Sequence, residues 1–263
     1  MFGIKKMPFV WVFVFCLVVK CLFLFTHHIQ EDAFISWRVA QNLLEYGVLG
    51  YNGNVPISAS TTHLYVFLSA IFQAIFGFER FVYPLLLFNI FCFTLGSYYF
   101  LRVFQAKEEP SFAWIFLLFN LSPPGIKASI LGMEYGLVML LYGLLLYFGL
   151  VKKEKKALFI IPFLLLWLRL DMAIFLVFSF FAWIYGHRSF PVYMVLGGIL
   201  GLATVLGFNY MYFGEVINHT ISAKKVAYQD LVLYPGWKRF NFMLKKEFGF
   251  LWGCMLCLKP FCM

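Results

Sequence analysis

The chain has 263 residues, of which 63% are hydrophobic, 22% are aromatic and only 13% are charged, and its formal net charge is +9. A soluble domain averages about half apolar and about a quarter charged residues, so this composition excludes a soluble enzyme and a nucleic-acid-binding protein. It predicts an all-α polytopic membrane protein, because helices satisfy their own backbone polar groups inside a bilayer.

The first hydrophobic run extends from about Pro8 to Phe25 and follows Lys5 and Lys6. A signal peptide is an alternative, but no A-x-A cleavage site follows the run, so we expect an uncleaved first helix. Lys20 lies inside this run. We expect its ammonium group to snorkel to a membrane interface.

Residues 26–81 are predicted to form a long first outer loop that carries interfacial helices. Asp32 to Glu45 has helical periodicity. Its apolar face comprises Ala33, Trp37, Ala40 and Leu44. Its polar face comprises Arg38, Gln41, Asn42 and Glu45. Such a helix is expected to lie in the plane of the membrane interface. Leu64 to Gly77 is apolar but short for a span, which predicts a re-entrant or interfacial segment.

About 7–8 transmembrane helices are expected in one transmembrane domain, residues 1–263. After the first, the predicted spans are 82–104, 112–121, 135–151, 157–168, 172–185, 192–212 and 248–258. The basic run at residues 152–156 then lies inside with the N-terminus, as the positive-inside rule requires. Residues 213–248 form a second long outer loop.

This topology gathers acidic and basic residues from four loops on the outer face: Glu31, Asp32, Lys127, Glu134, Arg169, Asp171, Glu215, His219, Lys224 and Lys225. Sugar transfer from a lipid phosphate requires a carboxylate that takes the proton from the acceptor hydroxyl. It also requires cations that stabilise the departing phosphate. The outer face therefore contains the groups that such a reaction needs.

The segment EDAFISWRVAQNLLEYG, residues 31–47, resembles the first outer loop of GT-C-fold glycosyltransferases, which begins with an acidic pair. The nearest likeness is to the branch of mycobacterial arabinofuranosyltransferases and dolichyl-phosphate-mannose-protein mannosyltransferases. Three shorter segments follow in the family's order. LGME (131–134), LRLD (168–171) and YFGE (212–215, continuing to Lys224) resemble the family's S-G-L-E, T-R-P-E and Y-Y-G-D motifs.

The resemblance implies an inverting membrane glycosyltransferase that uses a polyprenyl-phosphate sugar donor and a glycan, lipid or protein acceptor. It places the chain in a bacterial inner or plasma membrane, with a cytoplasmic N-terminus and a periplasmic or extracellular active side. Asp32 or Glu31 would be the general base. The implied substrate-binding residues are Arg38, Glu134, Arg169, Asp171, His219, Lys224 and Lys225.

Several departures from the family are present. Glu31 stands where the first Asp is usual, which leaves open which acid is the base. The family usually runs much longer, so its C-terminal part is expected to be missing here and a partner chain is an open alternative. No metal site or cofactor is assigned, although His27 and His28 beside the acids keep a divalent cation open as an alternative.

Each candidate also has a plain structural interpretation. The acidic pair could simply be favourable charge in a first helical turn, Glu134 could be a helix cap, Arg169 and Asp171 could form a local ion pair, and Lys224 and Lys225 could bind lipid headgroups. The alternative functions are an inactive or partner-dependent fragment of such an enzyme, and a lipid or sugar transporter. A transporter predicts ionisable residues within spans and broken helices.

Overall fold

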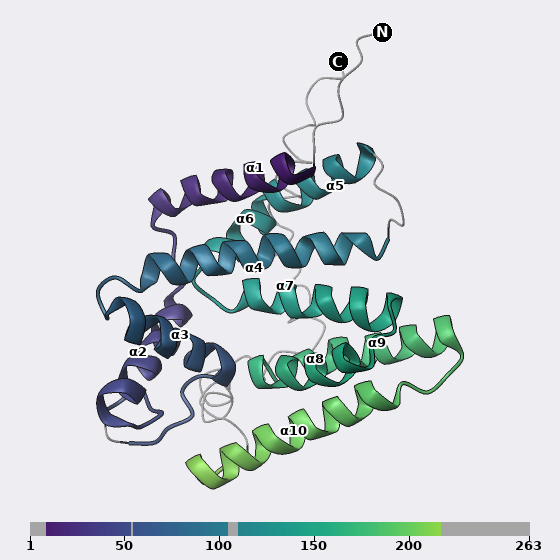
Figure 1. Ribbon diagram of the computed structural model, residues 1–263. Helices are drawn as coiled ribbons and strands as arrows, with labels where there is room; N and C mark the ends of the chain where they lie inside the picture. The colour runs from purple at the N-terminus through teal and green to yellow at the C-terminus, as the bar shows by residue number, and fades with distance from the viewer. Residues whose placement is uncertain (1–8, 54, 105–109, 217–263) are drawn as a thin grey trace, which may run out of the picture. The chain divides into compact units, whose positions relative to one another are not determined.

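The computed structural model describes residues 9–53, 55–104 and 110–216, all within one compact unit, Met1–Asn218. All regular structure in these ranges is helical, in agreement with the predicted all-α class (Figure 1). The elements in the first half are α1 (Phe9–Leu22), the 3-10 turn η1 (Phe23–Thr26), α2 (Glu31–Tyr46), α3 (His63–Phe76) and α4 (Val82–Arg102). Those in the second half are α5 (Pro110–Leu121), α6 (Pro123–Ile130), α7 (Tyr135–Leu144), the π-helical turn η2 (Leu145–Val151), α8 (Lys155–Leu168), α9 (Met172–His187) and α10 (Val192–Phe213).

Three of the described helices are long and apolar enough to cross a membrane: Phe9–Thr26, Val82–Arg102 and Val192–Phe213. A fourth candidate is the pair Pro123–Ile130 and Tyr135–Val151, which is bent by 109° at a short break. Helix length therefore supports three or four spans in the described residues, and the expected 7–8 are not confirmed. The other apolar helices are short; α9, with 16 residues, rises only ~24 Å, less than the thickness of a bilayer core.

The helix predicted over residues 32–45 is present as α2. It begins after Gln30, whose backbone is extended, and ends at Gly47, whose φ of 70° terminates the helix while its N–H donates to the Leu43 carbonyl. Two assigned positions on its faces are wrong. Leu44 is exposed, and Asn42 is fully buried.

Asn42 is buried because its side chain has a structural role that periodicity cannot reveal. Its amide donates hydrogen bonds to the carbonyl oxygens of Gly50 and Tyr51, at 2.7 and 2.8 Å. A buried amide with such partners is stable, whereas an unpaired one would be costly. This side chain therefore ties the loop after α2 back onto the helix.

Glycines set the closest helix contacts. α4 and α7 lie side by side, as do α8 and α10 (Figure 1). A β-carbon at Gly136 would collide with the backbone of Asn89, and one at Gly197 would collide with the backbone of Phe159. Small residues let helix backbones approach in this way in membrane proteins, where packing rather than water exclusion drives association.

Lys20 does not snorkel, so that prediction is wrong. Its side chain is 0% exposed, and its ammonium donates to Thr94 Oγ1 at 3.1 Å and to Asn120 Oδ1 at 2.7 Å. It also lies 4.3 Å from the centre of the Phe93 ring. Polar groups of α4 and α5 thus replace the aqueous interface that the sequence pattern favoured.

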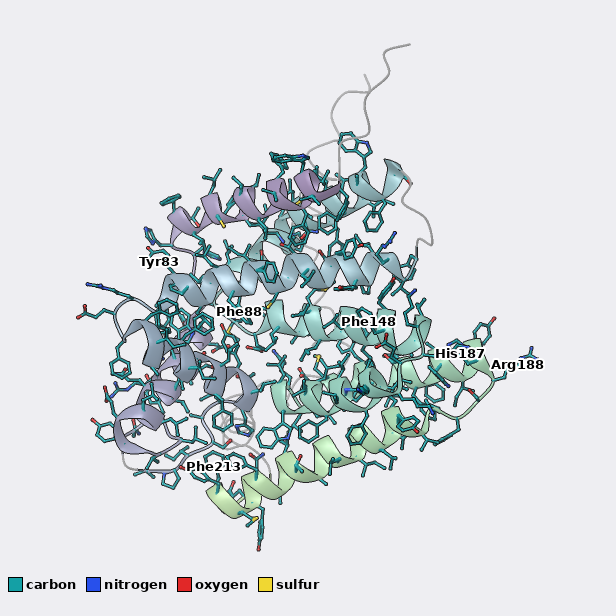
Figure 2. All side chains as sticks on the ribbon, in the orientation of Figure 1. Tyr83, Phe88, Phe148, His187, Arg188 and Phe213 are labelled. Carbon is teal, nitrogen blue, oxygen red and sulfur yellow. The ribbon has the colours of Figure 1, made fainter. Side chains whose placement is uncertain are left out.

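The helices place the ends of the predicted outer loops that the structure describes at one of their two ends. Figure 2 shows Tyr83 and Phe213 at one end, and His187 and Arg188 at the other. α9 begins at Met172 and finishes at His187, so its start lies away from Arg188. The start of α9 is therefore at the same end as the start of α4 and the finish of α10.

Candidate functional site

The start of α2 is held against the break between α6 and α7. The backbone N–H of Gln30 donates to the carbonyl of Leu131 at 3.0 Å. Gly132 has φ +77°, and a β-carbon there would lie 2.8 Å from the Trp37 ring and 3.2 Å from the Ala33 side chain. Both the left-handed backbone and the lack of space therefore require glycine at this position. The segment LGME thus lies directly against the segment that begins with the acidic pair.

Glu134, Arg169 and Asp171 form one ionic cluster. Arg169 Nη1 donates to Glu134 Oε1 at 2.6 Å, and its Nε and Nη2 donate to the two carboxylate oxygens of Asp171 at 2.8 and 2.7 Å. Glu134 is fully buried and Asp171 is half exposed. A carboxylate held by two parallel N–H bonds has a fixed orientation as well as a fixed charge partner.

Both structural interpretations of these residues can now be judged. Glu134 occupies the position before α7, but its side chain makes no capping hydrogen bond and contacts Arg169 instead. The local ion pair of Arg169 and Asp171 is confirmed, but the guanidinium also reaches Glu134, which is far away in sequence. The hydrogen bonds that Arg169 donates to Asp171 raise the pKa of Arg169, so its guanidinium stays charged at any physiological pH.

A network of uncharged hydrogen-bonding groups holds the break between α6 and α7 in place. Tyr65 is fully buried, and its hydroxyl donates to the Gly132 carbonyl at 2.8 Å and accepts from Asn89 Nδ2 at 2.7 Å. Sequence reasoning missed both residues. Asn89 could have indicated this network from the sequence. It is an amide inside a predicted apolar span, where an unpaired polar group is costly, so it requires a hydrogen-bond partner.

Glu31 and Asp32 form the first turn of α2, and both are exposed. Their carboxylates are therefore accessible to a ligand, unlike that of Glu134. Within the described ranges, no group of three or more His, Cys, Asp or Glu side chains is arranged to hold a metal ion, and this includes the set formed by His27, His28 and the two acids.

A groove of about 330 Å³ lies beside the ionic cluster, between α7 and α9. Arg169 and Asp171 line it together with an apolar wall that comprises Tyr135, Val138, Tyr142, Met172 and Phe175. α9 also carries exposed apolar side chains, of which Phe178 is one turn from Phe175 on the same side of the helix. The groove thus has a charged end and an apolar wall.

The fourth motif packs on the start of α3. His63 donates to Asn209 Oδ1 of α10 at 2.7 Å, and its ring stacks on Phe213. The Tyr212 hydroxyl accepts from the backbone N–H of Leu49 at 3.0 Å. The later residues of this motif that were assigned to substrate binding, His219, Lys224 and Lys225, lie outside the described residues.

Arg38 is separate from the ionic cluster. Its guanidinium donates to Gln41 Oε1 at 3.2 Å and lines a different cavity, on the side of α2 that faces α3 and the start of α4. The structure therefore brings Glu134, Arg169 and Asp171 into direct contact, links the acidic pair to them through the backbone at Gln30, and puts Arg38 elsewhere.

Comparison of the chain with protein-family models, curated proteins and solved structures finds no match. The functional assignment consequently rests on the residues and their geometry.

Proposed function

We propose that this chain is an integral-membrane glycosyltransferase of the GT-C type, which transfers a sugar from a polyprenyl-phosphate donor to an acceptor hydroxyl. The observation that carries the proposal is the meeting of three separate segments at one end of the helices. The exposed acids of α2 adjoin the break that contains Glu134, and Glu134 is bonded to Arg169 at the mouth of an apolar groove.

Each part has a chemical task in this reaction. Glu31 or Asp32 takes the proton from the acceptor hydroxyl as its oxygen attacks the anomeric carbon of the donor sugar. The bond from that carbon to the phosphate oxygen breaks, and the lipid phosphate leaves. The groove between α7 and α9 is suited to the tail of the donor, because its wall is apolar.

The two carboxylates beside Arg169 limit its ability to bind the donor phosphate alone. Three of its N–H groups are bonded to Glu134 and Asp171, which leaves two of the five guanidinium N–H groups for a ligand within the described contacts. Two carboxylates surround that one cation, so a phosphate requires further positive charge nearby. We assign this role to Lys224 and Lys225, with a divalent cation as the alternative source.

The proposed topology has 7–8 spans. It takes α3 as a re-entrant or interfacial segment and the short apolar helices α5 and α9 as spans in thinned bilayer. The N-terminus is cytoplasmic, and the acidic pair faces the periplasm or the exterior of a bacterial inner membrane. The basic segment from Lys152 to Lys156 follows η2 and includes the first two residues of α8, at the end of the helices away from the acids, which supports this orientation.

The test is transfer of radiolabelled sugar from a panel of polyprenyl-phosphate sugars in membranes that contain the chain. The double variant Glu31→Gln, Asp32→Asn is compared with Glu45→Gln, a matched carboxylate change at the other end of the same helix. We expect transfer by the unmodified chain and by Glu45→Gln, and none by the double variant when all three are equally inserted. Transfer retained by the double variant refutes the base assignment, and no transfer from any donor refutes an enzyme that acts without a partner.

A transporter is the second candidate, because two observations favour it. Lys20 is an ionisable group buried inside a candidate span, and the break between α6 and α7 bends that helix pair by 109°. Transporters often have both features. However, Lys20 contacts α4 and α5 rather than the break. Uptake of a labelled sugar lipid into proteoliposomes, abolished by Lys20→Met, would favour this candidate over transfer.

A further inference from the structure

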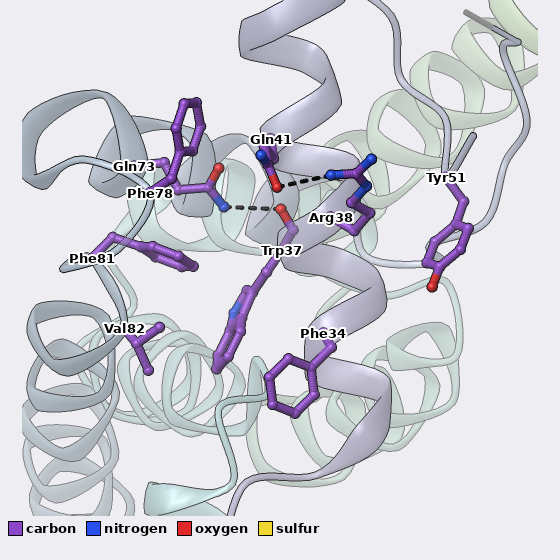
Figure 3. Close-up of a pocket in the computed structure, with 9 residues that line it drawn as sticks. All are labelled: Phe34, Trp37, Arg38, Gln41, Tyr51, Gln73, Phe78, Phe81 and Val82. Atoms are coloured by element: carbon purple, nitrogen blue, oxygen red, sulfur yellow. Dashed lines mark hydrogen bonds between the residues drawn. The ribbon is translucent and has the colours of Figure 1, made fainter. Parts of the chain in front are cut away.

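A second cavity, of about 390 Å³, lies between α2, α3 and the segment that leads into α4. Figure 3 shows the nine residues that line it: Phe34, Trp37, Arg38, Gln41, Tyr51, Gln73, Phe78, Phe81 and Val82. Its volume falls in the range of small-molecule sites, about 300–1,000 Å³. The proposed donor groove does not include it.

The walls are mainly aromatic, and their rings are mutually fixed. Phe34 and Trp37 meet edge to face with ring centres 5.1 Å apart, and Trp37 meets Phe81 in the same way at 5.5 Å. Fixed rings offer flat apolar surfaces at little entropic cost on binding. Such surfaces match the apolar C–H face of a sugar ring.

Polar groups are interleaved with these rings. Gln73 is 2% exposed; its Nε2 donates to the Trp37 carbonyl at 2.9 Å, whereas its Oε1 is buried without a hydrogen-bond partner. Figure 3 shows this amide between Phe78 and the backbone of Trp37, with Arg38 and Gln41 on the neighbouring part of α2. The wall formed by α2 therefore presents polar groups beside aromatic rings, whereas the wall formed by Phe78, Phe81 and Val82 is apolar.

The polar side chains that are open to the cavity narrow the choice of ligand. Arg38 is exposed and Gln41 is half-buried, and both line the cavity. An acyl chain there would cover these polar groups without pairing them, which is costly. Hydroxyls of a bound ring can accept from Arg38 and bond to Gln41, while the C–H face of the same ring packs on the aromatic side chains.

The cavity shares one face of α2 with the first of the two acids. Residues 31, 34, 38 and 41 are spaced by three, four and three, so they follow one another along a single helix face. Asp32 lies about 100° away around the helix. A ligand that occupies the cavity is thereby aligned with Glu31 rather than with Asp32.

We propose that this cavity binds a sugar unit, which is the acceptor sugar of the transfer reaction. The acceptor assignment rests on the proposed function; the binding of a sugar does not. Phe34 and Trp37 pack on the ring, Arg38 and Gln41 bond its hydroxyls, and Glu31 is the carboxylate that stands nearest along the helix.

The test is saturation-transfer NMR on the purified chain in phosphatidylcholine nanodiscs, which avoids sugar-based detergents. The probes are methyl pyranosides and methyl furanosides of common hexoses and pentoses, with cyclohexanemethanol as an apolar control of similar size. We expect at least one glycoside to bind and the control not to bind. No binding by any glycoside, or stronger binding of cyclohexanemethanol, overturns the proposal.

Variants locate the binding. Phe34 is half exposed, so Phe34→Ala is expected to fold and to lower glycoside affinity about fivefold, as loss of one aromatic contact does. Leu44→Ala removes an equally exposed side chain from the same helix but outside the cavity, and should leave affinity unchanged. Equal affinity in the two variants overturns the location.

The same preparation separates this proposal from the enzymatic one. The variant Glu31→Gln, Asp32→Asn should lose transfer but still bind the glycoside, because neither acid lines the cavity. Glycoside binding without transfer by the unmodified chain would support the cavity and refute the proposed reaction. Transfer without glycoside binding would do the opposite.

Discussion

Arg169→Met tests how much the ionic cluster contributes to folding. The variant leaves Glu134, which is 0% exposed, without its only charged partner among the described residues. Removal of one member of a buried ion pair typically costs about 3–5 kcal/mol, because the other charge stays buried. Arg169 itself is 26% exposed, so water can partly replace it, and we expect about 3 kcal/mol, the lower end of that range.

Two control variants make this expectation specific. Asp171 is half exposed, so Asp171→Asn should cost no more than about 1 kcal/mol. Arg169→Met combined with Glu134→Leu removes both buried charges and should regain most of the loss, since an apolar pair replaces a buried ion pair at little cost.

The measurement is the free energy of unfolding, followed by near-ultraviolet circular dichroism as dodecyl sulfate is added to dodecyl maltoside micelles. The reasoning fails if Arg169→Met destabilises the chain no more than Asp171→Asn does. It also fails if Glu134→Leu does not restore stability in the Arg169→Met background, because the cost would then not come from a stranded carboxylate.

Three further changes can be measured by the same unfolding assay. Tyr65→Phe removes a hydroxyl that both donates and accepts and should cost about 2 kcal/mol; a loss below about 0.5 kcal/mol would contradict the assigned network. Gly132→Ala should cost about 3 kcal/mol from its positive φ and the indole ring beside it, whereas Gly47→Ala, with a similar φ and open space, should cost only about 1 kcal/mol; equal losses would show that space is unimportant. Lys20→Met should stabilise the chain by about 1 kcal/mol, because removal of a buried charge outweighs the lost hydrogen bonds to Thr94 and Asn120, and it should leave sugar transfer intact; marked destabilisation would assign Lys20 an essential structural role.

The predicted helices were recovered best where the local sequence supplies its own boundaries. α2 begins at the acidic pair and ends at Gly47, as the charge pattern and the glycine indicated. α3 was expected as a short apolar segment and is one. The helix α6 was not predicted, because two prolines and a glycine normally indicate a loop. Here the Ser122 hydroxyl accepts from the Gly125 N–H and initiates the helix with proline in its first turn.

The candidate site was predictable in part. The charged residues at helix ends identified Glu134, Arg169 and Asp171 individually, and their contact required α7 and α8 to be packed together. The sequence did not identify Tyr65, Asn89 or Gln73, because the role of a polar side chain in an apolar run depends on its hydrogen-bond partner, and the sequence does not reveal that partner. The same applies to Lys20, whose partners are 74 and 100 residues away.

The sequence alone therefore determined the all-α class, the presence of apolar helices long enough to cross a membrane and the helix that begins at the exposed acids, since composition and period depend on neighbouring residues. Tertiary structure alone decided which charges are buried, which polar atoms are paired and where cavities form. Those properties depend on contacts between residues that are far apart in the sequence, above all at Gly132, Glu134 and Gln73. A local sequence pattern contains no information on such contacts.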